Sequence, residues 1–150
     1  MSRVARVPDD ERFRRASRVV TAVFGFAVLV SVVHYTDNVA GYDGYPQSDT
    51  LPNPSRWVIL GAWFGFTAFG IAGLVLMRDR RVRPAVLCLA VYSGSGLVGI
   101  GHYLVPGATD MDWWRQTHVV LDIAAAVVLL GVLLWCTQTL QPGRRRSVAT

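Results

Sequence analysis

Four long apolar runs constrain the fold of this 150-residue chain more than any other feature of its sequence. The runs cover residues Val19–Tyr35, Trp57–Met77, Ala85–Val105 and His118–Cys136. Crossing the ~30 Å hydrocarbon core of a bilayer takes roughly 20 helical residues. Because a backbone surrounded by lipid must satisfy its hydrogen bonds internally, runs of this kind can only be helices. The sequence therefore predicts an all-α integral membrane bundle of four transmembrane helices.

The composition supports a single membrane domain. Hydrophobic residues make up 52% of the chain, which is too apolar for an ordinary soluble domain. We expect a transmembrane domain over residues 19–137, preceded by a basic arm at residues 1–18 and followed by a basic tail at residues 138–150. The two cysteines, Cys88 and Cys136, lie inside apolar runs and fit neither a disulfide framework nor a zinc-finger spacing.

The placement of the arginines predicts how the helices are oriented. All 15 basic residues are arginines, and 13 of them fall in the arm, in the link at residues 78–84 and in the tail. Because arginine-rich loops stay in the cytoplasm, both termini and this link are predicted to be cytoplasmic, at the cytoplasmic (inner) membrane. The acidic loops at residues 37–55 and 106–112 then face outward. A signal peptide is the alternative for the arm and first run, but an uncleaved helix is expected.

The net charge of +5 raises the question of a nucleic-acid partner. Since the arginines lie where membrane topology puts them, we expect the lipid bilayer, and no nucleic acid, as the partner. Four helices are few for a transporter acting alone. A homo-oligomer, or docking on another membrane protein, is therefore a further hypothesis.

The three histidines are predicted to meet near the outward surface. His34 and His102 end the first and third runs, which lead outward, while His118 begins the fourth, which leads back. Asp122 follows His118 by four residues and so lies on the same helical face. An acid inside a spanning helix is costly and needs an inward-facing partner, which the imidazoles can supply. The outward loop at residues 37–55, rich in turn formers and tyrosine, either folds over this site as a lid or is a mobile surface loop.

Small and polar residues at helical spacing predict which faces turn into the bundle. The third run carries such a stripe, formed by Cys88, Tyr92, Ser95, Gly99 and His102. Steps of three or four residues put all of them on one face. The second run offers a Gly-x-x-x-Gly pattern, Gly61 and Gly65, which is a packing signature with many false positives. That run has no acid and no histidine, so we expect it to be a wall of the bundle.

Imidazoles and carboxylates at one depth predict a metal site. The proposed ligands are His34, His102, His118 and Asp122. Catalytic zinc sites use three protein ligands and leave a position for water, and non-haem iron takes two histidines and a carboxylate. A divalent transition metal, zinc or iron, is therefore the expected cofactor.

Further residues near the histidines are candidates for catalysis. Asp37 is expected as an additional ligand or as a base, with Asp110 as the alternative base. Tyr35 and Tyr103, beside two of the histidines, are expected to orient a substrate or donate a proton. If the protein is an enzyme, hydrolytic or oxidative chemistry on a lipid-soluble substrate from the outer leaflet follows.

Three other interpretations remain open at this point. The polar cluster can be purely structural, with Asp122 paired to a histidine in a non-catalytic membrane subunit that docks a partner. Two of the histidines can hold a haem, which would make the protein an electron carrier. The same groups can also relay protons or bind a small ligand without any metal.

Overall fold

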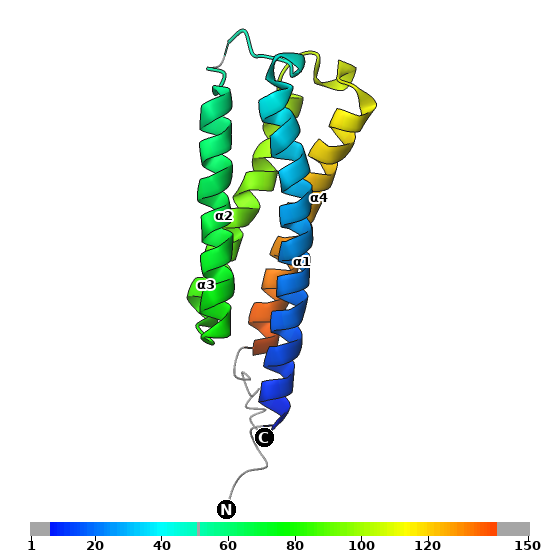
Figure 1. Ribbon diagram of the computed structural model, residues 1–150. Helices are drawn as coiled ribbons and strands as arrows, with labels where there is room; N and C mark the ends of the chain where they lie inside the picture. Colours follow the sequence, from blue (N-terminus) through cyan, green and yellow to red (C-terminus); the bar gives the residue numbers. More distant parts are fainter. Residues whose placement is uncertain (1–6, 51, 141–150) are drawn as a thin grey trace, which may run out of the picture.

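The computed structural model describes residues 7–50 and 52–140, and this part of the chain is helical and contains no strand. The α-helices are α1 (Val7–Ala40), α2 (Arg56–Arg78), α3 (Val82–Leu97) and α4 (Trp113–Leu140). Short 3-10 segments join or extend them: η1 (Tyr42–Gly44), η2 (Val98–Leu104) and η3 (Ala108–Asp110). Figure 1 shows an up-and-down bundle in which the start of α1 and the end of α4 lie at the same end.

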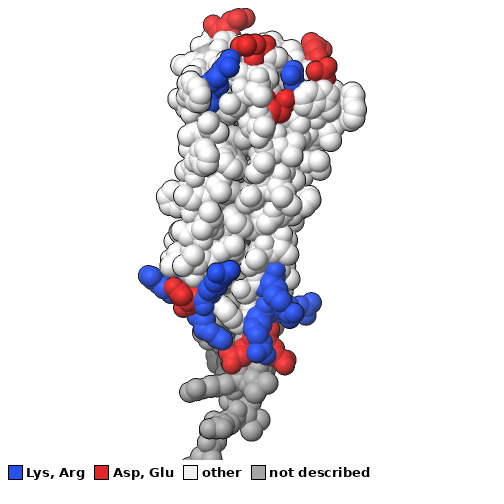
Figure 2. Space-filling model, in the orientation of Figure 1, with Lys and Arg blue, Asp and Glu red and all other residues white. Residues whose placement is uncertain are grey.

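The helices have the dimensions of membrane spans. Within the described residues, four helical stretches are long and apolar enough to cross a bilayer: Asp10–Ala40, Arg56–Arg78, Val82–Leu104 and Trp113–Leu140. Figure 2 shows charged side chains gathered at the two ends of the molecule, with an uncharged belt between them. The prediction of an all-α bundle with four such helices is confirmed for this part of the chain.

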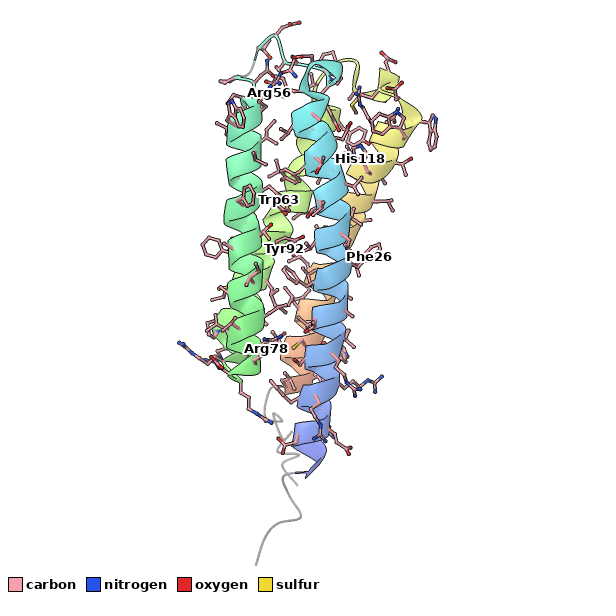
Figure 3. All side chains as sticks on the ribbon, in the orientation of Figure 1. Phe26, Arg56, Trp63, Arg78, Tyr92 and His118 are labelled. Atoms are coloured by element: carbon pink, nitrogen blue, oxygen red, sulfur yellow. The ribbon has the colours of Figure 1, made fainter. Side chains whose placement is uncertain are left out.

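The two ends of the bundle differ in character. One end, which we call the arginine end, carries the first turns of α1 and the link from α2 to α3. The opposite end, which we call the histidine end, carries the last turns of α1, the first turns of α2 and α4, and η2. Figure 3 shows Arg78 at the arginine end, and Arg56 and His118 toward the histidine end.

Helix α1 is longer than the first apolar run. It begins at Val7 and therefore takes in most of the predicted basic arm. Pro8 in its first turn suits a helix start, because proline lacks the N–H that this turn would leave unpaired. Arg80 fastens this extension to the α2–α3 link, since its guanidinium lies 2.9 Å from an Asp10 carboxylate oxygen and 4.6 Å from the Phe13 ring centroid. Residues 1–6 and 141–150, the remainder of the predicted arm and tail, lie outside the described residues.

The packing core runs between α1, α3 and α4, where buried side chains such as Val20, Phe24, Leu89 and Leu129 meet. Helix α2 is the least buried of the four and forms an edge of the bundle. Its contacts pass through Gly70 and Gly73, where a Cβ would collide with Phe24 and Leu89 respectively.

Among the described residues, the Gly-x-x-x-Gly pattern of α2 makes no close helix contact. Gly61 and Gly65 are exposed, and a Cβ on either would meet no atom within 4 Å. The close approach of helices that such a pattern permits occurs instead one to two turns farther along, at Gly70.

The third predicted helix, residues 85–105, does not remain α-helical to its end. It changes to the 3-10 segment η2 at Val98, in a stretch where glycines recur and helix propensity is low. Gly96 explains the position of this change, because a Cβ there would lie 2.6 Å from the Asp122 carbonyl oxygen of α4. Close contact with α4 thus brings η2, and His102 with it, over the site.

Candidate functional site

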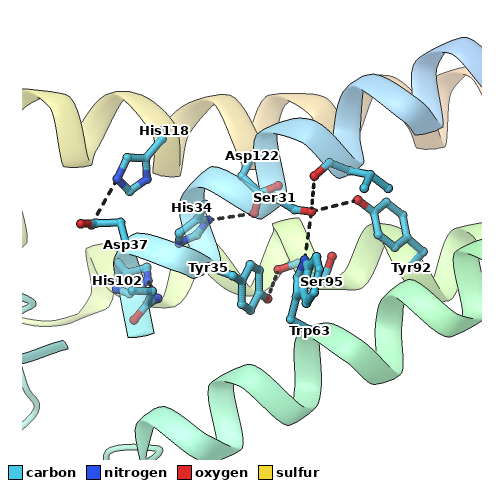
Figure 4. Close-up of polar contacts among 12 residues, drawn as sticks. Ser31, His34, Tyr35, Asp37, Trp63, Tyr92, Ser95, His102, His118 and Asp122 are labelled. Carbon is cyan, nitrogen blue, oxygen red and sulfur yellow. Dashed lines mark hydrogen bonds and ion pairs between the residues drawn. The ribbon is translucent and has the colours of Figure 1, made fainter. Parts of the chain in front are cut away.

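The centre of the site is a buried pair between α1 and α4. The Nδ1 atom of His34 lies 2.8 Å from Oδ2 of Asp122, and both residues are 2% exposed. The predicted need of Asp122 for a histidine partner is therefore met by His34 (Figure 4). Because only Nδ1 is engaged, the other ring nitrogen of His34, Nε2, is buried without a hydrogen-bond partner.

The other two histidine rings flank this pair. The ring centroids of His102 and His118 lie 5.6 Å and 5.5 Å from that of His34. The structure thus brings together three rings that are separated by 84 positions in the sequence, from His34 to His118. Antiparallel connectivity explains this, since the end of α1, η2 and the start of α4 all lie at the histidine end.

His102 is held in a defined tautomer. Its Nε2 lies 3.1 Å from Nδ2 of Asn38, one turn beyond His34 on α1. An amide nitrogen can only donate, so Nε2 of His102 accepts and its Nδ1 carries the proton. Tyr45 covers the other side of this ring, with 5.0 Å between centroids.

A second polar cluster lies around Asp37, closer to the histidine end. One carboxylate oxygen, Oδ2, accepts a 2.5 Å hydrogen bond from the Tyr45 hydroxyl. The same atom lies 3.3 Å from Nε2 of His118 and 3.4 Å from Nε of Arg115. Arg115 also donates to the Gly44 carbonyl oxygen at 3.1 Å. This cluster ties α1, the outward loop and α4 together.

The described part of this loop, residues 41–50 and 52–54, therefore closes over the site, with Tyr45 bound to Asp37. Tyr45 is 4% exposed, and burial, the hydrogen bond to Asp37 and the negative charge of Asp37 all raise its pKa well above the ordinary value. The Tyr45 hydroxyl consequently stays protonated and remains a donor to Asp37 at physiological pH. This arrangement is the lid, one of the two alternatives that the sequence left open for this loop.

The two tyrosines predicted to act beside the histidines occupy different places. Tyr35 is buried and donates its hydroxyl proton to the Ser95 carbonyl oxygen at 3.0 Å, which couples α1 to α3. The Tyr103 hydroxyl is buried without a partner, and its ring packs on the small cluster around Met111 and Val119. Asp110, the alternative base, is exposed in η3, so it does not share the surroundings of the His34–Asp122 pair.

Deeper in the bundle, a third set of polar contacts surrounds Ser31. Its hydroxyl oxygen accepts from Trp63 Nε1 at 3.1 Å and lies 3.3 Å from the Tyr92 hydroxyl (Figure 4). These contacts join α1, α2 and α3 one turn below His34. The set has a structural role, because its polar atoms satisfy each other inside the apolar belt.

A pocket opens beside the histidine pair, between α1, α2, η2 and the loop. Its volume is about 340 Å³, within the range of small-molecule sites. His34, Tyr35, Asn38 and His102 provide polar lining, and residues of α2 such as Ile59 and Phe66 provide apolar walls. Among the described residues that line it there is no aspartate, glutamate, arginine or lysine.

The structure brings the predicted metal ligands near one another but does not point them at one common position. His102 and His118 each lie beside the His34 ring, but Asp122 lies at Nδ1 of His34, a position that orients a ligand ring. In the part of the chain that the structure describes, no group of three or more His, Cys, Asp or Glu side chains could hold one metal ion. The expectation of zinc or iron stays a prediction.

Sequence reasoning did not propose Asn38, Tyr45 or Arg115 as site residues. Arg115 carries a signal in hindsight, because it is one of only two arginines placed away from the basic segments. Asn38 shares the face of His34 at a spacing of four residues. Tyr45 has no helical periodicity to place it, since it lies in the loop that follows the 3-10 segment η1.

Comparison of the chain with known protein families, with curated proteins and with solved structures gives no match.

Proposed function

We propose that this protein is a multi-pass membrane protein that binds a small, neutral, lipid-soluble ligand in the pocket beside His34. The observation that carries the proposal is a pocket of about 340 Å³ with apolar walls, lined in part by the buried residue His34. Pockets of this size, with apolar walls and few convergent polar groups, are the usual form of small-molecule sites. The lack of charged lining residues favours a neutral ligand.

The walls of the pocket favour access from the membrane. Val58 on α2 and Val98 on η2 both line the pocket and are 59% and 63% exposed. These side chains lie on surfaces that lipid would contact in a bilayer. With the arginine end in the cytoplasm, as the positive-inside rule indicates, the pocket would open toward the outer leaflet of the cytoplasmic membrane.

Filling the pocket tests this function. Ala62 on α2 lines the pocket, so Ala62→Phe should occupy space that the ligand needs. Ala68 lies on the same helix, is exposed and does not line the pocket, so Ala68→Phe is the matched control. Small molecules extracted from each protein in lipid nanodiscs would be identified by mass spectrometry, with empty nanodiscs as blank.

We expect wild type and Ala68→Phe to retain a lipid-soluble compound at a comparable ratio to protein, and Ala62→Phe to lose it. Equal content in all three proteins, or content no higher than in empty nanodiscs, would contradict the proposal.

A metal centre is the second candidate, favoured by one specific observation. A carboxylate at Nδ1 of a histidine leaves Nε2 free, which is the arrangement that supports many metal-bound histidines, and His34 has it. His102 and His118, with Asp37 as ligand or base, would have to move to join it, because among the described residues they do not form one metal-holding group with His34. Elemental analysis of purified protein would test this, and absorption in the visible region would report a haem. Less than stoichiometric metal would remove this candidate and leave the ligand pocket or a non-catalytic subunit.

A further inference from the structure

We propose that the arginine end carries a headgroup site for an anionic phospholipid, in a groove between the first turns of α1 and the last turns of α4. The groove has a volume of about 460 Å³, and its lining is formed by Arg12, Arg15, Trp135, Gln138 and Thr139. It lies at the opposite end of the bundle from the pocket beside His34 (Figure 1). The inference therefore goes beyond the proposed function and does not depend on it.

Helix geometry gathers the lining side chains at this groove. The two α1 residues lie three positions apart, and the three α4 residues lie within four positions, so each set shares one helical face. Their sequence neighbours Ala16 and Cys136 are both 0% exposed and belong to the packing core. These two small side chains hold α1 and α4 together, and the groove opens outward from their contact.

The positive charge of the groove has no acidic counterpart within it. The described residues that line it include two arginines and no aspartate or glutamate. No ion pair between described side chains involves Arg12 or Arg15, whereas Arg56, Arg80 and Arg115 each pair with an aspartate. Two guanidinium groups are thus available to an anion. Their planar fork of N–H donors matches the oxygens of a phosphate group.

The α4 side of the groove adds uncharged donors. The amide of Gln138 carries two N–H donors, and the hydroxyl of Thr139 and the indole of Trp135 each carry one. A phosphate ester with hydroxyl groups beside it, as in a glycerol headgroup, can use both kinds of contact. The chemistry of the lining therefore favours an anionic phosphodiester.

The depth of the groove favours a lipid over a phosphate compound in solution. Arg15 precedes Val19, the first residue of the first apolar run, by four residues, or about 6 Å along a helix. Trp135 lies one residue before the end of the fourth run, and tryptophan is enriched at membrane interfaces. In a bilayer spanned by the four helices, the groove would lie at the level of the headgroups. Basic pockets between helices on the cytoplasmic side typically bind anionic lipids.

A second pair of arginines on α1 provides a matched control. Arg14 and Arg18 are also exposed at the arginine end, but they line a separate groove whose lining comes from α1 alone. Replacing either pair by glutamine removes two positive charges from the same end of the molecule. The two double variants therefore weaken general electrostatic attraction equally and differ in whether the α1–α4 groove is changed.

Fluorine NMR of 5-fluorotryptophan-labelled protein in dodecyl maltoside micelles tests the proposal. The resonance that is missing in Trp135→Phe identifies Trp135, the reporter in the groove. The other four tryptophans, in the first halves of α2 and α4, report whether each variant keeps its fold. Phosphatidylglycerol should shift the Trp135 resonance to saturation, and zwitterionic phosphatidylcholine should not. This comparison uses the wild type, so it stands whatever a variant does.

The variants should differ strongly in affinity for phosphatidylglycerol. Arg12→Gln combined with Arg15→Gln should weaken it about thirtyfold, since each arginine near a membrane surface contributes to anionic lipid binding. Arg14→Gln combined with Arg18→Gln should weaken it by less than about threefold. Glycerophosphoglycerol, the headgroup without acyl chains, should not reproduce the shift at the same concentration.

Four results would overturn the proposal. They are no saturable shift with phosphatidylglycerol, the same shift with both lipids, equal weakening in the two double variants, or an equal effect of glycerophosphoglycerol. The last would mean that the groove takes a soluble phosphate ester. None of these results bears on the pocket beside His34.

Discussion

At the scale of single residues, we expect one buried pair to dominate how substitutions in the site change the free energy of unfolding. His34 and Asp122 are 2% exposed and 2.8 Å apart. Removing one member of such a pair leaves the other unpaired in a medium that cannot solvate it, whereas removing both avoids that cost. The pair therefore predicts strongly non-additive mutant effects.

The double-mutant cycle makes this prediction quantitative. His34→Leu and Asp122→Leu should each lower the free energy of unfolding by about 3 kcal/mol, while the double variant should lose much less than the sum. Equilibrium unfolding in detergent micelles, followed by circular dichroism, measures all three. Losses that simply add would mean that the two side chains do not depend on each other.

Arg115 and Arg56 both lie at the histidine end, but their ion pairs differ in how deeply they are buried. Arg115 and Asp37 have side chains 17% and 16% exposed, whereas those of Arg56 and Asp43 are 44% and 90% exposed. Arg115→Leu should therefore destabilise by about 1.5 kcal/mol, and Arg56→Leu by less than about 0.5 kcal/mol. Hydrogen exchange at residues 41–45 should accelerate only in the Arg115 variant. Equal exchange in the two variants would contradict the role of Arg115 in closing the loop.

At the scale of elements, glycines decide how closely η2 and α3 approach α4. A Cβ at Gly96 would lie 2.6 Å from the Asp122 carbonyl oxygen and 2.8 Å from the Ala126 Cβ, whereas one at Gly61 meets open space. The backbone oxygen cannot move without shifting a helix, so a methyl group at residue 96 must separate α3 from α4.

Alanine substitutions at these two glycines should differ in their effect on stability. Gly96→Ala should lower the free energy of unfolding by about 2 kcal/mol through overpacking, and Gly61→Ala should leave it unchanged or raise it by about 0.5 kcal/mol. Thermal unfolding of the two variants, compared with wild type, is the measurement. A stable Gly96→Ala protein would show that this helix contact can relax.

The sequence predicted elements better than it predicted the contacts between them. Hydropathy located the four helices because lipid forces each span to satisfy its own backbone. Periodicity placed His118 and Asp122 on one face, and topology brought the three histidines to one level. The partner of Asp122 was left open, because helix rotation and the 3-10 form of η2 depend on packing that periodicity does not encode. The lid was one of two forms left open for the loop, and neither the residues that line the pocket nor the contact of Tyr45 with Asp37 could be predicted, for the same reason.

At the scale of the whole molecule, an uncharged belt separates two charged ends. The arginine end carries the first turns of α1 and the α2–α3 link, and the positive-inside rule predicts that this end is cytoplasmic. On the orientation proposed above, the pocket at the opposite end would face the outer leaflet, from which a lipid-soluble ligand would enter.

Cysteine labelling tests this orientation. Asp49 in the loop over the site and Asp79 in the α2–α3 link are both exposed, so each can be replaced by cysteine after Cys88→Ala and Cys136→Ala. A membrane-impermeant maleimide should label residue 49 in intact cells and residue 79 only after permeabilisation. The reverse pattern would invert the orientation and move the pocket to the inner leaflet.

Photolabelling tests most directly whether the pocket beside His34 takes a ligand from the membrane. A naphthyl ketone carrying a diazirine would be dissolved in the nanodisc lipid, activated by light, and its attachment sites located by peptide mass spectrometry. We predict labelling concentrated on the pocket walls, at residues 58–66 and 98–105, and suppressed by Ala62→Phe. Labelling spread evenly over lipid-facing residues such as Phe69 and Val127, and unaffected by Ala62→Phe, would contradict the existence of the site.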